Sequence, residues 1–290
     1  MTLPSAPRRR PFRQLDVFAD RSLRGNPLAV VLDAEDLSDE EMQRLARWTN
    51  LSETTFLLAP TDPGADYRVR IFTGSGELPF AGHPTLGTAR AWLDAGGAPA
   101  GERIVQECAA GLIQVRRDGD RLAFAAPPLR RSGPLEEVDV ARIARALGIP
   151  RADVRGHSWA DNGPGWRVVE LGDAEEVLAL RPDLSAVQDL KIGVLGWHRS
   201  GGDRPPETSG APLYEVRAFA PGFVEDPVTG SLNAGIAQWL VGRGGVPPRW
   251  TAAQGTALDR AGRVDVQVEA DGTIWIGGGT VTTIEGTILA

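Results

Sequence analysis

The sequence contains few of the cysteine and histidine residues that disulfides and metal sites require. Its 290 residues include one cysteine, Cys108, and three histidines, and Lys191 is its sole lysine. A single cysteine excludes an internal disulfide and a cysteine-rich zinc site. No apolar run reaches the roughly 20 residues that a membrane-spanning helix needs. Residues 1–11 also hold no apolar core of a secretion signal. We therefore expect a cytoplasmic protein without a membrane partner.

Several common catalytic and nucleotide-binding motifs are also missing. The chain has no Gly-x-Ser-x-Gly elbow, no Walker phosphate loop, no His-Glu-x-x-His zinc motif and no dinucleotide fingerprint. No set of metal-ligating residues stands out at a suitable spacing. We therefore expect chemistry that uses neither a metal ion nor a cofactor.

The composition is that of an ordinary globular protein. Hydrophobic residues make up 42% of the chain and charged residues 24%, which leaves room for two cores. The net charge is -7 and the acidic residues are dispersed, so no nucleic-acid partner is expected. The one concentrated basic run, Arg8-Arg9-Arg10, is expected in a solvated N-terminal tail.

The chain contains one order of predicted elements twice. In each half, a strand with an Arg-x-Phe motif leads through a turn with Pro or Gly into a helix that ends in Trp-Leu. A long-period duplication of this kind predicts two paired domains rather than a solenoid. The corresponding segments are 26–31 with 166–170, 70–93 with 217–240, and 106–111 with 254–262.

We expect two similar halves, each with strands around one main helix. The stretch 126–134, rich in Pro and Gly, is the best candidate linker. This gives an N-terminal half of residues 1–128 and a C-terminal half of residues 129–290. The last strand, about residues 278–290, could cross back to the first half.

An acidic turn in the second half is a candidate for anion binding. Asp226 and Pro227 interrupt regular structure, and the Thr-Gly-Ser sequence that follows offers a hydroxyl able to cap a helix. Apolar residues then recur at helical spacing over residues 232–240. A helix that begins there directs its free N–H groups at whatever lies in front of Gly230 and Ser231. The sequence thus predicts an anion site with the Asp226 carboxylate beside it.

His83 and Glu53 are the other candidates for chemistry. His83 lies in a Gly-His-Pro-Thr turn at a predicted helix start, although a single histidine is more often a packed structural residue. If the two halves face each other, this turn opposes the Asp226 turn and pairs an imidazole with a carboxylate. Glu53 lies at the entry of a predicted strand, after a helix with a Ser38–Glu41 capping box. It is either a surface charge or a partly desolvated general acid and base.

Six short motifs follow one another along the chain, and each alone is modest. They are Asp16-Val17-Phe18, residues 25–30 (Gly-Asn-Pro-Leu-Ala-Val), residues 50–56 (Asn-Leu-Ser-Glu-Thr-Thr-Phe), Arg70-Ile71-Phe72, residues 77–85 (Glu-Leu-Pro-Phe-Ala-Gly-His-Pro-Thr) and residues 225–231 (Glu-Asp-Pro-Val-Thr-Gly-Ser). In this order, followed by Gln254-Gly255, they make the chain resemble the phenazine-biosynthesis PhzF-like family nearly end to end.

This resemblance implies a fold like that of diaminopimelate epimerase. Such a fold is α+β, with two similar domains that each wrap a β-barrel-like sheet around a central helix, and with the active site in the interdomain cleft. Family members are typically homodimers, so a homodimer is expected. The implied activity is cofactor-independent isomerisation: proton transfer on a small cyclic or unsaturated carboxylic acid similar to dihydro-hydroxyanthranilate.

The resemblance also implies roles for individual residues. Glu53 matches the family's proton-transferring glutamate, and His83 and Asp226 match the other two catalytic positions, which flank the substrate. Ser231 and the neighbouring backbone amides would hold the substrate carboxylate. The expected substrate contacts are Gly82, Gly230 and Ser231. Residues 73–76 and 252–263 depart from the usual family pattern, which leaves the substrate open.

Two other functions compete with this interpretation. A racemase or epimerase on the same fold needs two opposed thiols, which Cys108 alone cannot supply. A non-catalytic protein that binds a small acid or an interaction partner could also keep the scaffold. Retention of Glu53, His83 and Asp226 argues against that reading.

Overall fold

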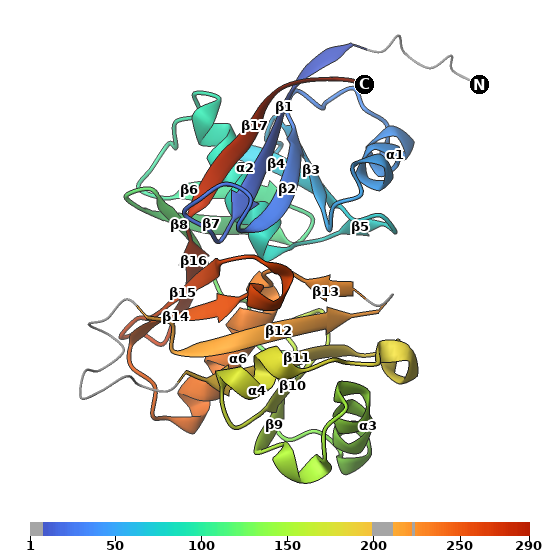
Figure 1. Ribbon diagram of the computed structural model, residues 1–290. Helices are drawn as coiled ribbons and strands as arrows, with labels where there is room; N and C mark the ends of the chain where they lie inside the picture. Colours follow the sequence, from blue (N-terminus) through green and yellow to red (C-terminus); the bar gives the residue numbers. More distant parts are fainter. Residues whose placement is uncertain (1–7, 199–210, 222–223) are drawn as a thin grey trace. The chain divides into compact units, whose positions relative to one another are not determined.

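The computed structural model describes residues 8–198, 211–221 and 224–290 (Figure 1). The chain divides into two compact units, Met1–Phe124 with Gly279–Ala290, and Ala125–Gly278. The expected boundary after residue 128 therefore lies just inside the second unit. Both units combine helices and strands, so the α+β class expected from the sequence is confirmed.

The first unit is a mixed sheet with strand order β17-β1-β2-β3-β4-β6-β7-β8. The pairs β2–β3 and β4–β6 are parallel and cannot be joined by hairpins, so the chain connects them through α1 and α2. Helix α2 packs against β1, β2, β3, β6, β7 and β17, which buries residues 82–89. The elements are β1 (Arg9–Val17), β2 (Asn26–Val31), α1 (Asp39–Thr49), β3 (Thr54–Leu58), β4 (Tyr67–Phe72), β5 (Glu77–Leu78), α2 (Gly82–Asp94), β6 (Ile104–Cys108), β7 (Gly111–Asp118), β8 (Arg121–Ala125) and β17 (Thr280–Leu289).

The second unit repeats this pairing scheme, with strand order β9-β10-β11-β12-β14-β15-β16. Its parallel pairs, β10–β11 and β12–β14, correspond to β2–β3 and β4–β6, and the chain connects them through α4 and α6. Strand β13 pairs with β12 as β5 pairs with β4, so the predicted duplication is confirmed. The elements are α3 (Glu137–Leu147), β9 (Gly156–Trp159), β10 (Trp166–Glu170), α4 (Ala174–Ala179), β11 (Lys191–Trp197), β12 (Tyr214–Ala220), β13 (Val224–Asp226), α6 (Gly230–Arg243), β14 (Arg249–Gln254), β15 (Gly262–Val268), β16 (Ile274–Gly278) and the 3₁₀ helices Arg151–Asp153, Leu184–Val187 and Thr256–Leu258.

The same ion pair occurs in both units. Arg70 on β4 binds Glu77 through two hydrogen bonds of 2.8 and 2.7 Å, and its guanidinium lies 5.1 Å from the centre of the Phe72 ring. Arg217 on β12 binds Glu225 through two bonds of the same lengths, 2.8 and 2.7 Å. The arginine of each Arg-x-Phe motif thus joins its strand to the short strand that precedes the main helix.

The N-terminal basic run is part of the fold, so its expected place in a solvated tail is wrong. Strand β1 begins at Arg9 and lies between β2 and β17. The Arg10 side chain is only 2% exposed, and its Nη1 donates to Asp36 Oδ1 at 2.6 Å and to the carbonyl of Asp33. Its Nε donates to the carbonyl of Ala290. Because the chain returns at its end as β17, it covers residues that would otherwise face solvent.

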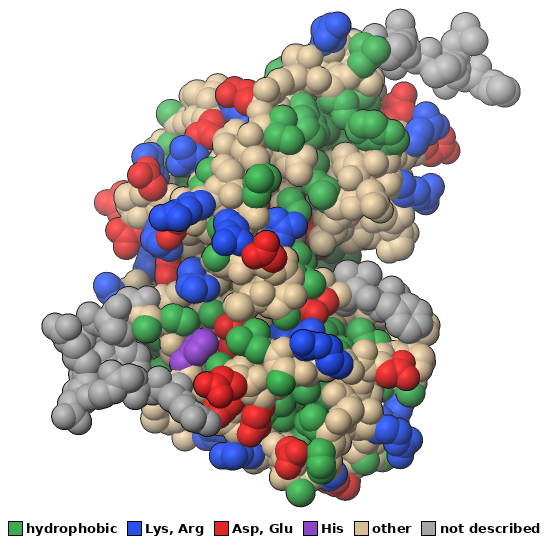
Figure 2. Space-filling model, viewed as in Figure 1, with side chains coloured by type: hydrophobic (Ala, Val, Ile, Leu, Met, Phe, Trp, Pro, Cys, Tyr) green, Lys and Arg blue, Asp and Glu red, His purple; other side chains and the backbone are tan. Residues whose placement is uncertain are grey.

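Charged side chains of both signs interleave on the face drawn in Figure 2. Neither unit shows there a broad area of one sign, in line with the dispersed acidic residues of the sequence. Among the helices of the described residues, none has the length and apolar character needed to cross a membrane.

Candidate active site

Glu53 is held at the start of a central strand. Helix α1 ends at Thr49, its C-cap residue Asn50 adopts a left-handed conformation (φ 56°), and β3 begins at Thr54. Thr54 and Thr55 are fully buried, and β3 is hydrogen-bonded to a strand on each side. The Glu53 side chain is 16% exposed. A carboxyl group directly before such a strand has a fixed position and limited contact with solvent.

His83 lies in the first turn of α2, where Pro84 is tolerated because its missing N–H would have no intrahelical acceptor. The imidazole is 5% exposed. Burial lowers the pKa of His83 to about 3, while a hydrogen bond to the backbone of Pro27 acts in the opposite direction. Proline has no backbone N–H, so its carbonyl must accept this bond from the ring. The imidazole is therefore neutral at pH 7.

Glu53 and His83 lie side by side within the first unit. The His83 Nε2 atom is 3.6 Å from Glu53 Oε2 and has no hydrogen-bond partner among the described residues. Since the bond to Pro27 therefore uses Nδ1, the neutral ring presents a lone pair at Nε2. A lone pair and a carboxylate oxygen attract each other only when a proton lies between them. The pair thus suits a carboxyl group that alternates between its acid and base forms.

Asp226 lies at the end of β13 in a turn that is tightly bonded within the second unit. Thr229 Oγ1 donates to Asp226 Oδ2 at 2.7 Å. The fully buried Gln254 donates to Thr229 Oγ1 and to the Asp226 carbonyl, both at 3.0 Å. Its Oε1 accepts from the Thr229 backbone at 3.0 Å and from Asn233 Nδ2 at 2.8 Å. Gln254 therefore fixes both the backbone of the turn and the direction of the Thr229 hydroxyl.

Gly230 and Ser231 form the first turn of α6. Ser231 Oγ accepts a hydrogen bond of 3.0 Å from the indole Nε1 of Trp166, and the Ser231 carbonyl accepts one of 2.9 Å from Asn162. An indole N–H can only donate, so it leaves the serine proton free to point elsewhere. The helix start thus offers backbone N–H groups together with an oriented hydroxyl.

The structure brings the predicted residues together in two clusters, one in each unit. Glu53, His83 and Gly82 belong to the first, with Gly82 as the first residue of α2. Asp226, Gly230 and Ser231 form the second. Sequence reasoning assigned no role to the residues that hold the second cluster, which are Gln254, Trp166 and Asn162. In the sequence, Gln254 stands out only through its Gln-Gly motif and Trp166 only as the start of a repeated segment.

Cys108 does not belong to either cluster. It ends β6, is 8% exposed, and burial raises the pKa of its thiol. Within the described part of the chain, no group of three or more His, Cys, Asp or Glu side chains is arranged to hold a metal ion.

The chain belongs to the phenazine biosynthesis-like (PhzC-PhzF) family, whose family model matches residues 15–286. A trans-2,3-dihydro-3-hydroxyanthranilate isomerase from Pseudomonas aeruginosa is 34% identical over 267 residues, which cover 89% of this chain and 90% of that protein. Antisense-enhancing sequence 1 from Schizosaccharomyces pombe is 38% identical over 296 residues, covering 95% of this chain and 97% of the relative.

Solved structures agree with this assignment. A crystal structure of a PhzF-family phenazine biosynthesis protein from Enterococcus faecalis superimposes with a TM-score of 0.78 at 25% identity, covering 98% of this chain and all (100%) of the other. Epimerases also appear among the structural neighbours, so the epimerase-like fold implied by the sequence is confirmed.

Proposed function

We propose that this isomerase moves a proton within a small cyclic or unsaturated carboxylic acid, with Glu53 as general acid and base. The observation that carries the proposal is the 3.6 Å approach of Glu53 to a buried, neutral imidazole. As a carboxylate, Glu53 takes a proton from a carbon atom of the substrate, and the electron pair moves into the adjacent unsaturated system. The protonated Glu53 then returns the proton to another carbon, so nothing is consumed overall.

His83 supports this cycle as a hydrogen-bond acceptor. Its Nδ1 proton is committed to Pro27, so Nε2 can accept a hydrogen bond from protonated Glu53 or from a substrate N–H or O–H group. A charged imidazolium would instead favour the carboxylate form of Glu53 and oppose protonation. A neutral His83 therefore keeps both forms of Glu53 accessible.

The roles of Asp226, Gly230, Ser231 and Gly82 are proposed from the family resemblance. Backbone N–H groups at a helix start and a serine hydroxyl suit a carboxylate. The bond from Trp166 to Ser231 Oγ supports this assignment because it leaves the hydroxyl proton available to a ligand. Asp226, held by Thr229, would accept hydrogen bonds from substrate N–H or O–H groups.

The first substrate to test is trans-2,3-dihydro-3-hydroxyanthranilic acid, after the name of the Pseudomonas aeruginosa relative. Incubation in deuterated water, followed by NMR, reports proton transfer directly. We expect deuterium uptake with the wild-type protein and with Glu40→Gln, an exposed carboxylate in the first turn of α1. Glu53→Gln should abolish uptake while leaving binding of the acid nearly intact.

Undiminished uptake by Glu53→Gln would remove Glu53 from the mechanism. Binding without uptake by the wild-type protein would favour the alternative, a protein that binds small acids without turnover. A homodimer and a cytoplasmic location are further proposals that rest on the resemblance and on the sequence. Light scattering after gel filtration tests the dimer, since a single species of 30.9 kDa would contradict it.

A further inference from the structure

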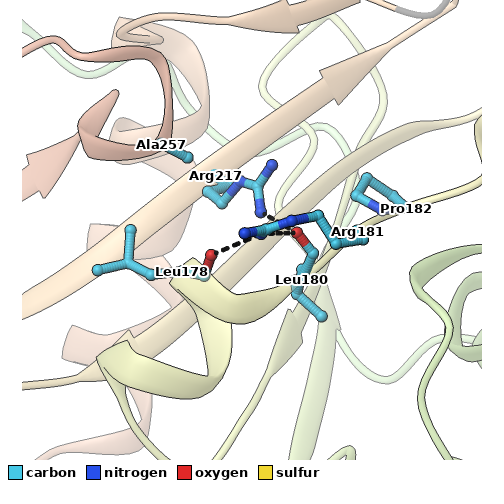
Figure 3. A pocket seen from close by; sticks show the side chains of 6 residues that line it. All are labelled: Leu178, Leu180, Arg181, Pro182, Arg217 and Ala257. Atoms are coloured by element: carbon cyan, nitrogen blue, oxygen red, sulfur yellow. Dashed lines mark hydrogen bonds between the residues drawn. The ribbon is translucent and has the colours of Figure 1, made fainter.

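A surface pocket in the second unit has no part in the reaction proposed above. It has a volume of about 520 Å³ and lies where the end of α4, strand β12 and the 3₁₀ helix Thr256–Leu258 meet. Figure 3 shows that its walls combine apolar side chains with two guanidinium groups. The lining residues are Leu178, Leu180, Arg181, Pro182, Arg217 and Ala257.

The Arg217 guanidinium is almost fully committed to the protein. Its Nε and Nη2 bind Glu225, and its Nη1 donates to the carbonyls of Leu180 at 2.9 Å and Val177 at 3.3 Å. Its side chain is 6% exposed. Arg217 therefore lines one wall of the pocket as a member of a fixed ion pair with Glu225.

Arg181 is bound at only one of its nitrogens. Its Nη1 donates to the carbonyls of Leu178, Ala179 and Leu180 at 3.2, 3.2 and 2.8 Å, which neutralises the carbonyl end of α4 (Figure 3). Its Nε and Nη2 have no partner among the described residues, and no described carboxylate lies within 4.0 Å of it. The free edge of the guanidinium is therefore the edge formed by Nε and Nη2. Arg70 and Arg217 each bind a glutamate through this same edge.

The first unit provides an internal comparison. In that unit, Arg70 occupies the position that Arg217 has in the second unit. Arg70 binds two carboxylates: Glu77, and Asp39 at 2.6 Å from its Nη1. In the second unit, Arg217 binds one carboxylate, Glu225, and the neighbouring Arg181 binds only backbone carbonyls. Arg181 is exposed, so an anion can reach its free edge, where no described carboxylate occupies the guanidinium.

We propose that this pocket binds a small organic anion through a carboxylate or phosphate group on the free edge of Arg181. A planar guanidinium edge matches both groups with two parallel hydrogen bonds. The apolar part of the ligand packs against Leu178, Pro182 and Ala257.

Calorimetric titration at constant ionic strength tests the proposal, with benzoate, phenyl phosphate and inorganic phosphate as probes. The affinities of benzoate and phenyl phosphate distinguish a carboxylate from a phosphate group. The difference in affinity between phenyl phosphate and inorganic phosphate measures the contribution of the apolar ring. Ser231→Ala removes the hydroxyl donor of the proposed active site, so a probe that binds this variant with unchanged affinity does not bind at that hydroxyl. Hydrogen exchange should show protection confined to the segments that line the pocket, residues 177–182, strand β12 and residues 256–258, when a probe is bound.

We expect Arg181→Gln to weaken binding about tenfold or more, since a charge-assisted bidentate pair is lost. Arg145→Gln is the matched control, because Arg145 is also exposed at a helix end and should bind as the wild type does. Ala257→Phe fills the pocket without removing a charge and should also abolish binding. Equal binding by Arg181→Gln, protection elsewhere, or no binding of any probe at millimolar concentration would overturn the proposal.

Discussion

Trp166 donates its indole N–H to Ser231 Oγ over 3.0 Å. Trp166 lies on β10 and Ser231 on α6, and the tryptophan is only 4% exposed. This bond occupies one acceptor position of the hydroxyl, so the serine proton has fewer directions in which to point. Trp166 is therefore a positioning residue for the proposed carboxylate contact.

Trp166→Phe should raise KM about fivefold and leave kcat nearly unchanged, because one neutral hydrogen bond contributes about 1 kcal/mol. Steady-state kinetics with the NMR-verified substrate measures both constants. Trp48→Phe, at a site that is 76% exposed, is the control for a general effect of losing an indole. A fall in kcat with constant KM would contradict the positioning role.

The buried His83 makes stability depend on pH. Its pKa is lowered from 6.5 to about 3 in the folded protein, so below pH 6.5 the unfolded chain takes up a proton that the folded chain does not. Unfolding free energy therefore falls as the pH decreases, by about 1.4 kcal/mol per pH unit. His83→Asn, which retains a donor for Pro27, should lack this contribution.

Urea unfolding at pH 7 and pH 5 measures this difference. Between these values the wild type should lose about 2 kcal/mol more than His83→Asn. Parallel pH profiles for the two proteins would show that His83 does not stay neutral when folded.

Gln254 should be among the most sensitive polar residues of the second unit. Gln254→Leu leaves the Thr229 backbone N–H and the Asn233 amide without their buried acceptor, which costs about 3 kcal/mol of unfolding free energy. Gln188→Leu, at an exposed glutamine, should change stability by less than about 0.5 kcal/mol. Similar losses for both variants in thermal unfolding would argue against the network.

The two Arg–Glu pairs offer a test of burial with the chemistry held constant. Exposed fractions are 6% and 13% for the side chains of Arg217 and Glu225, but 24% and 35% for Arg70 and Glu77. Glu225→Gln should therefore cost about 3 kcal/mol, and Glu77→Gln about 1 kcal/mol or less. Chemical denaturation of both variants measures the two costs, and an equal or reversed order would refute the dependence on burial.

Local signals in the sequence predicted the local structure well. The Ser38–Glu41 capping box forms at the start of α1, because its two partners are three residues apart and meet whenever the helix forms. Glu53 at the entry of β3 and His83 at the start of α2 follow from the same kind of short-range pattern. The duplication extended these local predictions to two similar halves, each with strands around one main helix.

Long-range partners could not be predicted in this way. The bonds from Trp166 and Asn162 to Ser231 depend on where β10 and its preceding loop lie beside α6, which no short motif encodes. Arg10 was misplaced for the same reason, since its burial depends on a strand from the far end of the chain. The joint action of Glu53 and Asp226 on one substrate stays a prediction.

The pairing of β17 with β1 also bears on the order of events during synthesis. Residues 280–289 are synthesised after all of Ala125–Gly278, whereas their neighbour β1 is synthesised before it. The nascent first unit therefore has an unpaired edge at β1 while all of Ala125–Gly278 is translated and begins to fold. A stop codon that removes residues 280–289 would therefore damage the unit that is synthesised before Ala125–Gly278.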